Sequence, residues 1–382
     1  MEALAAANAN FSLELFKKIT EITKAKNTGN VFYSPLSISS ALAMVSLGAK
    51  GNTEVQMHET LNLNKVEGDV HVAFNKLFAE LNKDGAPYAL ILANRLYGEK
   101  TYKFVEKFLA DTKTLYLAEL EEVDFISNAE AARVKINKWV EKKTRETIKD
   151  LLAKGILDTD TRLVLVNATY FKGDWDMKFN SVQTTEVPFK INKNESKPVQ
   201  MMHQSTLFTL TYVPDANCQI LELPYEGKDM SMLIMLPNNM EDNTTGLEKL
   251  EQMLTYDKLV EWTRPDMMHT VWVEVGLPRF KLEETYDLEE ILVSMGMVDA
   301  FSPQCDFSGM SCDNLVLSKV VHKSFVEVNE EGTVAGAATA SLVNVGCGLD
   351  SPERFMADHP FLFFIRHNPT QSILFYGRYS SP

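Results

Sequence analysis

Few residues of this chain stand at the spacings that catalysis or metal binding requires. The four cysteines (Cys218, Cys305, Cys312 and Cys347) show no C-x-x-C spacing, and no histidine has a second histidine four residues away. The segment Gly309–Asp313 comes nearest to a G-x-S-x-G nucleophile motif but lacks the closing glycine. Cys347 is a nucleophile in principle, yet no feature marks a base that would activate it. The sequence therefore predicts no enzyme, no metal site and no cofactor.

Charge and composition limit the partners and the compartment of the protein. The 382 residues carry a formal net charge of −14, which disfavours nucleic acids and membrane surfaces as partners of the whole molecule. The few, scattered cysteines favour reduced thiols, and the N-terminus lacks the basic region and apolar core of a cleavable signal peptide. We therefore expect a cytoplasmic protein, with release from the cell without a signal peptide as an alternative.

One segment runs against the acidic balance of the chain. Residues 129–149 are predicted to form a helix with seven basic side chains, namely Arg133, Lys135, Lys138, Lys142, Lys143, Arg145 and Lys149. Such a face could bind a polyanion. The simpler interpretation is a solvated helix face, because Glu141 and Glu146 are interleaved with the cations.

Helical patterns crowd the first half of the chain, and strand patterns crowd the second half. Helices are expected at 11–24, from Ser34 as N-cap to about Gly48, and at 71–82, 103–115 and 129–149. Strands are expected at 164–171, 218–225, 230–237, 270–283, 361–367 and 372–378. This order is typical of an α+β fold with large, mostly antiparallel sheets. Without repeats or linkers, residues 1–382 are expected to form a single domain.

The segment from Glu330 to Asp350 raises the main functional question. It follows a clear strand pattern, and between Gly332 and Leu349 it carries no charged residue. As a strand, it would have one face of small residues that could enter a packed sheet, namely Thr333, Ala335, Ala337, Thr339 and Ser341. Insertion would satisfy a dozen or more backbone hydrogen bonds, worth on the order of 10–15 kcal/mol. The alternative interpretation is a flexible loop.

Four blocks of the sequence resemble blocks of the serpin family. They are NVFYSPLSISSALAMVSLGAKGNT (30–53), LVNATYFKGDWDMKF (165–179), EEGTVAGAAT (330–339) and FMADHPFLFFI (355–365). The resemblance covers essentially the whole chain. The short N-terminus and the ending GRYSSP are similar to the intracellular, ovalbumin-related branch, clade B. The resemblance implies an α+β fold with about nine helices and three β-sheets, and an exposed reactive loop at about 330–352.

The resemblance also implies a mechanism and a set of residues that perform it. A target protease attacks the loop and forms an acyl-enzyme, and the cleaved loop then inserts as a central strand from Thr333 onward. The resemblance assigns the hinge to Glu330, Glu331, Gly332, Thr333, Val334, Ala335, Gly336, Ala337 and Ala338. It assigns control of sheet opening to Ser34, Ser37, Asn167 and His322, with Trp175 where the loop first enters. The helix that binds heparin in some relatives corresponds to about 71–82 and has only Lys76 as a basic residue.

Three residues are candidates for the position before the scissile bond, namely Val345, Gly346 and Cys347. The count forward from Glu330 and the count back from the block at 355–365 give positions that differ by one residue. No Lys or Arg lies between Gly332 and Glu353, which disfavours trypsin-like targets. The sequence therefore predicts a monomeric suicide-substrate inhibitor of elastase- or chymotrypsin-like serine proteases, with papain-like cysteine proteases as further candidates. The alternative is a non-inhibitory serpin that acts as a binding, chaperone or storage protein.

Overall fold

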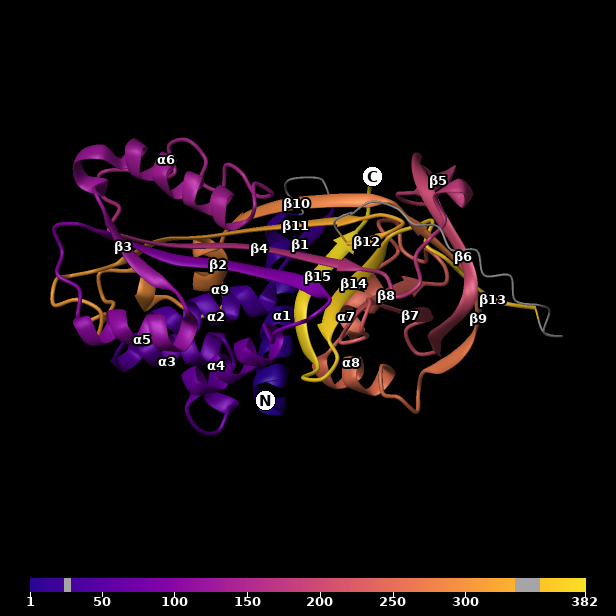
Figure 1. Ribbon diagram of the computed structural model, residues 1–382, viewed down its shortest axis with the longest axis horizontal. Helices are drawn as coiled ribbons and strands as arrows, with labels where there is room; N and C mark the ends of the chain where they lie inside the picture. The colour runs from indigo at the N-terminus through magenta and orange to yellow at the C-terminus, as the bar shows by residue number, and fades with distance from the viewer. Residues whose placement is uncertain (24–28, 334–350) are drawn as a thin grey trace.

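The computed structural model describes residues 1–23, 29–333 and 351–382 (Figure 1). Within them the chain forms nine α-helices and three short 3-10 helices, so the expected number of helices is confirmed. The α-helices are α1 (Glu2–Thr23), α2 (Pro35–Ser46), α3 (Gly51–Thr60), α4 (Val70–Leu81), α5 (Glu106–Tyr116), α6 (Phe125–Lys143), α7 (Glu248–Met253), α8 (Tyr256–Trp262) and α9 (Glu289–Ser294).

The strands of the described residues form two hydrogen-bonded sheets. The nine-stranded sheet contains β1 (Val31–Tyr33), β15 (Ser372–Tyr379), β14 (Phe361–His367), β8 (Met230–Pro237), β7 (Cys218–Pro224), β6 (Ser196–Val213), β9 (His269–Pro278) and β13 (Glu353–Met356) in this order, with β5 (Thr185–Lys190) paired to β6. The six-stranded sheet contains β10 (Phe280–Asp287), β11 (Leu317–Val328), β12 (Gly332–Thr333), β4 (Leu163–Asp174), β2 (Tyr88–Glu99) and β3 (Glu119–Val123) in this order.

The long strand β6 explains why two sheets are seen where three were expected. It is 18 residues long and pairs with β9 over 201–210 and with β7 over 209–213. One strand thus joins two groups of strands through its two ends. The strands therefore form two sheets instead of the expected three, while the α+β class is as predicted.

Three helices have boundaries that differ from the prediction, and one of them is α5, which was expected at 103–115 and begins at Glu106. The first helix was expected at 11–24, but α1 begins at Glu2, because the alanine-rich start favours a helix and buries Leu4 and Ala7. The helix expected at 129–149 is α6, which begins at Phe125 and ends at Lys143, because Arg145 and Glu146 have left-handed φ values of +51° and +63°. The buried Glu99 carboxylate accepts hydrogen bonds from the first two amides of α6, at 2.8 and 3.1 Å, so the helix starts one turn earlier than the side-chain pattern indicates.

The strand expected at 270–283 is two strands that belong to different sheets. β9 ends at Pro278, β10 begins at Phe280, and the exposed Arg279 lies between them with its amide bonded to the carbonyl of Gln200 at 2.8 Å. An alternating pattern continues through the break, so the sequence alone does not reveal it. Arg279 therefore lies at the corner between the two sheets.

The six-stranded sheet separates two hydrophobic cores (Figure 1). Neighbouring residues of β4 point to opposite faces, so Leu163 belongs to the larger core and Val164 to the smaller one. The smaller core lies between the sheet and α6, and it includes Val321 and Phe325 of β11. Hence α6 covers a region of the sheet to which both β4 and β11 contribute.

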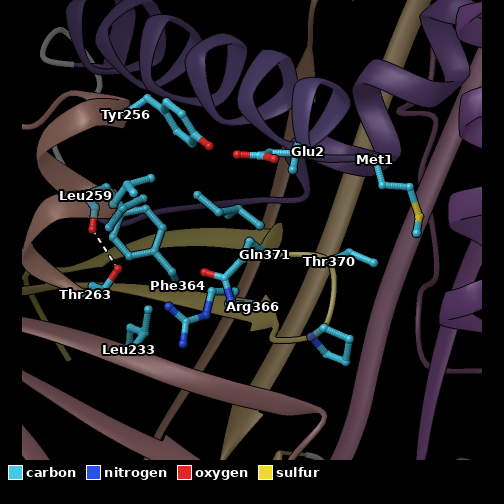
Figure 2. A pocket seen from close by; sticks show the side chains of 14 residues that line it. Met1, Glu2, Leu233, Tyr256, Leu259, Thr263, Phe364, Arg366, Thr370 and Gln371 are labelled. Carbon is cyan, nitrogen blue, oxygen red and sulfur yellow. Dashed lines mark hydrogen bonds between the residues drawn. The ribbon is translucent and has the colours of Figure 1, made fainter. Parts of the chain in front are cut away.

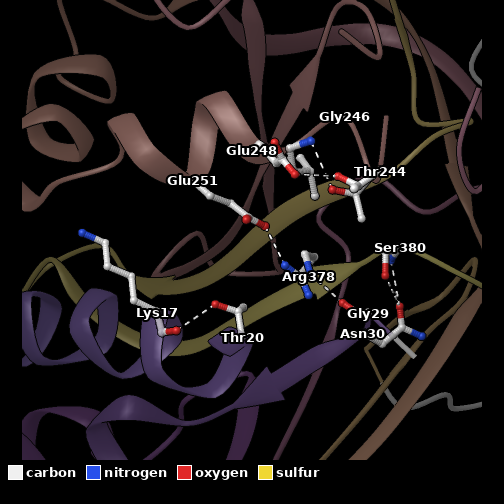
Figure 3. Close-up of polar contacts among 12 residues, drawn as sticks. Lys17, Thr20, Gly29, Asn30, Thr244, Gly246, Glu248, Glu251, Arg378 and Ser380 are labelled. Carbon is white, nitrogen blue, oxygen red and sulfur yellow. Dashed lines mark hydrogen bonds and ion pairs between the residues drawn. The ribbon is translucent and has the colours of Figure 1, made fainter. Parts of the chain in front are cut away.

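The C-terminal strand β15 is fixed between β1 and β14 by a buried arginine (Figure 3). Arg378 donates from Nε to the carbonyl oxygen of Gly29 at 2.5 Å and from Nη1 to the Glu251 carboxylate of α7 at 2.8 Å. Asn30 accepts a hydrogen bond from the amide of Ser380 at 2.8 Å. These contacts connect the chain end to β1 and α7 across more than 100 residues of sequence.

Candidate functional site

The candidate site is the seam between β4 and β11. The two strands pair directly and in parallel from Leu163 and Leu317 to Tyr170 and Phe325. Beyond this point they separate, and the short strand β12 fills the gap, with Thr333 paired to Val328 of β11 and to Gly173 of β4. The seam is therefore closed along most of its length and already contains the first residues of the uncharged segment at one end.

The turn that leads into β12 is built around Asn329 and Gly332. The Asn329 amide donates to the carbonyl of Gly332 at 3.0 Å, and its side-chain oxygen accepts from the amide of Glu331 at 3.0 Å. Gly332 has a φ of +153°, and a Cβ there would overlap the Gly173 carbonyl and lie 2.7 Å from the Asp174 Cα. The close approach to β4 thus requires glycine at this position.

The two carboxylates before β12 are anchored by different partners. Glu330, whose side chain is 8% exposed, accepts from Arg279 at 2.5 and 3.0 Å and from the hydroxyl of Thr184 at 2.6 Å. Glu331 pairs with Lys178 at 2.9 Å. Burial raises the pKa of Glu330, but the hydrogen bonds from Arg279 and Thr184 outweigh it, so the net shift of this pKa is downward. Glu330 is therefore held as a carboxylate.

An aromatic pair holds the chain on both sides of this turn. Trp175 donates from its ring nitrogen to the carbonyl of Asn329 at 2.9 Å and from its amide to the carbonyl of Glu331 at 2.8 Å. Its ring stacks on Tyr225 with centroids 4.6 Å apart. The Tyr225 hydroxyl is hydrogen-bonded to the Thr333 hydroxyl at 2.8 Å in a fully buried environment. Trp175 and Tyr225 thus fix the start of β12 from the direction of β4 and β7.

A second polar cluster lies under the closed part of the seam. His322 of β11 is the register partner of Asn167 of β4, and both contact the N-terminus of α2. The Ser34 amide can only donate, and it lies 3.1 Å from His322 Nε2. Nε2 therefore accepts, and the ring proton is on Nδ1, which donates to Asn167 Oδ1. Asn167 in turn donates to the Ser37 hydroxyl at 2.6 Å.

The cluster joins five elements, namely α2, β2, β4, β11 and β15, through hydrogen bonds. Ser34 caps α2 by accepting from the Ser37 amide at 3.2 Å and donates its hydroxyl to the carbonyl of Leu374 in β15 at 2.7 Å. Thr169 donates to the Ser37 hydroxyl at 2.6 Å, and Asn167 also donates to Asn94 of β2. The cluster members Ser34, Ser37, Asn167, Thr169 and His322 are all buried. Separating β4 from β11 would break this network at the His322–Asn167 bond.

Burial lowers the pKa of His322 to about 3, because the charged imidazolium loses the solvation by water that stabilises it in the unfolded chain. The unfolded chain binds a proton at a pKa of about 6.5, whereas the folded chain does not until about pH 3. The contribution of the neutral His322 to the free energy of unfolding is therefore complete above pH 6.5. It is lost progressively as the pH falls from 6.5 toward 3.

His322→Gln is expected to flatten the pH dependence of stability. Between pH 7.5 and pH 5 the wild type should lose about 2 kcal/mol more apparent free energy of unfolding than the variant, since 1.5 pH units lie below the unfolded pKa. Urea unfolding at both pH values measures this difference, and the other histidines cancel because both proteins carry them. Equal pH slopes in the two proteins would contradict a neutral, buried His322.

The predicted site residues therefore fall into three groups. Ser34, Ser37, Asn167 and His322 form one cluster, and Trp175 lies at the turn with the described hinge residues Glu330, Glu331, Gly332 and Thr333. The remaining hinge residues Val334, Ala335, Gly336, Ala337 and Ala338, and the candidates Val345, Gly346 and Cys347 for the reactive bond, lie outside the described residues.

Sequence reasoning missed the partners that hold the turn. Arg279, Lys178, Thr184 and Tyr225 contact the hinge from 51 to 153 residues away in sequence. Of these, Arg279 gives a weak signal, because it is a charged residue between two apolar strand patterns. The others lie in unremarkable positions, and only the folded chain brings them to the seam.

A separate concave site lies between α1, α8 and the strands β14 and β15 (Figure 2). Its volume is about 310 Å³, and its apolar lining includes Leu259, Phe364 and Ile373. The one basic side chain of its lining is Arg366, which is 11% exposed, pairs with Glu222 at 3.5 Å and donates to Asn368 at 2.9 Å. Burial lowers the pKa of Arg366, and the nearby carboxylate of Glu222 partly offsets this effect.

Neither a metal cluster nor a membrane span is found in residues 1–23, 29–333 and 351–382. No three His, Cys, Asp or Glu side chains of this part of the chain gather closely enough to hold a metal ion. No helix there is long and apolar enough to cross a membrane.

Comparison with known proteins identifies the architecture. Residues 6–382 match the family described as serpin, serine protease inhibitor. Over 100% of both chains, the sequence is 54% identical to the leukocyte elastase inhibitor of Sus scrofa, 53% to that of Homo sapiens and 54% to serpin B6 of Macaca fascicularis. The resemblance to the ovalbumin-related branch of the serpin family is thereby confirmed.

Solved structures agree with the sequence relatives. Uncleaved ovalbumin superposes with a TM-score of 0.90 at 38% identity over 100% of both chains. Human thyroxine-binding globulin, complexed with its hormone, superposes with a TM-score of 0.89 at 31% identity, over 100% of this chain and 99% of that one. The seam, the closed cluster and the turn described above thus sit in a serpin fold, and the chain belongs to the serpin family.

Proposed function

We propose that this serpin is a suicide-substrate inhibitor of elastase- or chymotrypsin-like serine proteases and performs no catalysis itself. One observation carries the proposal, namely that β12 already lies between β4 and β11 at one end of an otherwise closed seam. A segment that continues from Thr333 along this direction would enter the sheet between these two strands. The relatives named leukocyte elastase inhibitor support a protease as the partner.

The pairing directions favour such an insertion. β4 and β11 pair in parallel, whereas β12 is antiparallel to both. A strand that continued β12 would replace one parallel ladder with two antiparallel ladders, which have slightly better hydrogen bonds per residue. At about 1 kcal/mol net for each added bond, the closed sheet would be metastable relative to the inserted one by on the order of 10 kcal/mol.

The sequence of the segment supports the class of target. A protease with a carboxylate in its specificity pocket finds no Lys or Arg between Gly332 and Glu353, whereas Val345, Gly346 and Cys347 suit shallow or apolar pockets. Papain-like cysteine proteases are secondary candidate targets. We further propose that the protein acts as a cytoplasmic monomer of one domain and needs no cofactor.

Incubation with neutrophil elastase, chymotrypsin and a cathepsin, followed by denaturing gels, tests this function. We expect a covalent adduct that resists denaturation, at near-unit stoichiometry, with one serine protease. Mass spectrometry of the released C-terminal peptide then identifies the residue before the scissile bond. Clean cleavage without an adduct for every protease, and no gain in thermal stability after cleavage, would exclude inhibition.

The concave site beside α8 favours a second candidate function, that of a binding protein for a small apolar acid. Its apolar lining could take an aromatic body, while Arg366 offers a cation at one side and Glu2 a carboxylate at another (Figure 2). The solved complex of thyroxine-binding globulin shows that this fold can carry a small ligand. Fluorescence titration with anilinonaphthalene sulfonate, compared between wild type and Arg366→Gln, tests the site. Equal affinities would exclude a role for Arg366, and no saturable binding would exclude the site.

A further inference from the structure

We propose that the outer face of α6 binds a linear sulfated polysaccharide, through a groove that is separate from the seam. The groove has a volume of about 520 Å³ and is lined by Lys138, Glu141, Lys142, Arg145 and Glu146. All three cations are exposed. Ile136 and Val140 of α6 belong to the core between the helix and the sheet, so the groove residues face away from that core, and binding there would not depend on protease inhibition.

The three cations of this groove have no ionic partner, unlike Arg133 and Lys135 in the first half of α6. Arg133 pairs with Glu130, Lys135 pairs with Glu121, and these pairs neutralise the first half of the helix. In the part of the chain that the structure describes, no carboxylate lies within 4.0 Å of the charged nitrogens of Lys138, Lys142 or Arg145. Unpaired cations remain free to neutralise an external anion.

The acidic lining of the groove is partly neutralised. Glu141 is paired with Lys149 at 3.2 Å, which leaves Glu146 as the one unpaired carboxylate among the five lining residues. The local balance is therefore three unpaired cations against one carboxylate, in a protein whose net charge is −14. The groove is a basic area on an acidic molecule, and electrostatic attraction would guide a polyanion to it.

Helix stabilisation explains only part of this arrangement. Cations in the last turn of a helix interact favourably with its dipole, which accounts for Lys142. Lys138 lies about 6 Å further back along the axis, at about 1.5 Å per residue, and Arg145 lies beyond the helix end. Arg145 and Glu146 have φ values of +51° and +63°, a left-handed conformation that costs a non-glycine residue stability. This strained turn places Arg145 in the groove lining beside the helix cations.

The groove chemistry favours a polysaccharide over a nucleic acid. Single-stranded nucleic acids are held by basic grooves that also offer aromatic rings for stacking. No lining residue of this groove is aromatic, and the neighbouring Trp139 ring is covered by the Arg95 guanidinium at 4.9 Å. A flexible chain whose charges are carried on sulfate groups needs only the row of cations. The expected helix for such binding, α4, has Lys76 as its single basic residue other than His71.

Affinity chromatography and titration with heparin as the probe test this inference. The full-length protein should be retained on immobilised heparin at about 50 mM NaCl and should elute at higher salt, with a salt dependence of about three ionic contacts. Lys138→Gln/Lys142→Gln/Arg145→Gln should lower the affinity at least about tenfold and remove most of this salt dependence. Glu146→Gln should bind more tightly than the wild type, because it removes the opposing carboxylate.

A charge-matched control separates this site from general electrostatics. Lys17→Gln/Lys76→Gln/Lys249→Gln removes the same charge from α1, α4 and α7, and it should keep the wild-type affinity within about twofold. No retention of the wild type at 50 mM NaCl, or equal losses in both triple variants, would overturn the site. A single-stranded oligonucleotide that binds as tightly as heparin at equal charge would overturn the choice of polysaccharide.

Discussion

Glu330→Lys is expected to destabilise the protein strongly and to open the seam at the end where β12 lies between β4 and β11. The substitution removes a carboxylate that accepts three hydrogen bonds from Arg279 and one from Thr184, and it places an ammonium group against the guanidinium. Hydrogen bonds to charged groups contribute about 1.5–3 kcal/mol each when intact. Because Arg279 is 46% exposed and can turn to water, we expect a loss of about 3 kcal/mol in total.

Thermal unfolding and native gels measure the consequence. The variant should unfold at a lower temperature and form soluble polymers on mild heating, since an opened seam exposes unpaired edges of β4 and β11. The double variant Glu330→Lys/Arg279→Glu restores opposite charges and should recover at least half of the lost stability. Glu331→Gln removes a single ion pair, to Lys178, from a carboxylate that is more exposed than that of Glu330. It serves as the matched control and should have a smaller effect. A wild-type unfolding temperature for Glu330→Lys would contradict the anchoring role.

The elements that the sequence predicts well are those with local signals. The start of α2 follows from Ser34 and Pro35 alone, because the cap and the first helical position are consecutive residues. The hairpin of β14 and β15 follows from two apolar runs around a short polar turn. In both cases the physical cause lies within a few residues, so no knowledge of the tertiary structure is needed.

Boundaries set by distant residues were not predictable. The start of α6 depends on the Glu99 carboxylate, which lies 26 residues away and accepts the first amides of the helix. The break between β9 and β10 depends on which sheet each half joins, while the alternating pattern continues through Arg279. Local periodicity reports which face is buried, but it does not report which neighbour covers that face.

In the candidate site, too, some residues have a local signal in the sequence, while their contacts depend on distant residues. Glu330 and Glu331 are visible in sequence as the end of a charged region, but their ionic partners are not. His322 and Asn167 lie 155 residues apart, and no pattern in either segment indicates that they meet. Family resemblance supplied these residues, and the register of β4 and β11 supplies the reason, since the two are opposite each other across the seam.

Thr333→Arg is expected to turn the proposed inhibitor into a substrate. Thr333 is fully buried between β4 and β11, with its hydroxyl bonded to Tyr225, and it is the residue from which insertion would continue. A guanidinium at this position must be desolvated before the strand can extend, and no described carboxylate contacts Thr333 to pair with it. If this raises the insertion barrier by about 1.4 kcal/mol, insertion slows about tenfold, and hydrolysis of the acyl-enzyme then competes.

The stoichiometry of inhibition against the most sensitive protease measures how the acyl-enzyme divides between strand insertion and hydrolysis. The wild type should need about one molecule per protease. In Thr333→Arg the number of molecules consumed in excess of one should rise about tenfold, and cleaved protein should accumulate. Thr333→Ser keeps the hydroxyl that contacts Tyr225 and should retain the wild-type stoichiometry. The second-order rate of the initial encounter should stay unchanged in both variants, because the proposed reactive bond lies beyond the proposed hinge. An adduct of Thr333→Arg at unit stoichiometry would show that the cleaved segment does not enter the seam at Thr333.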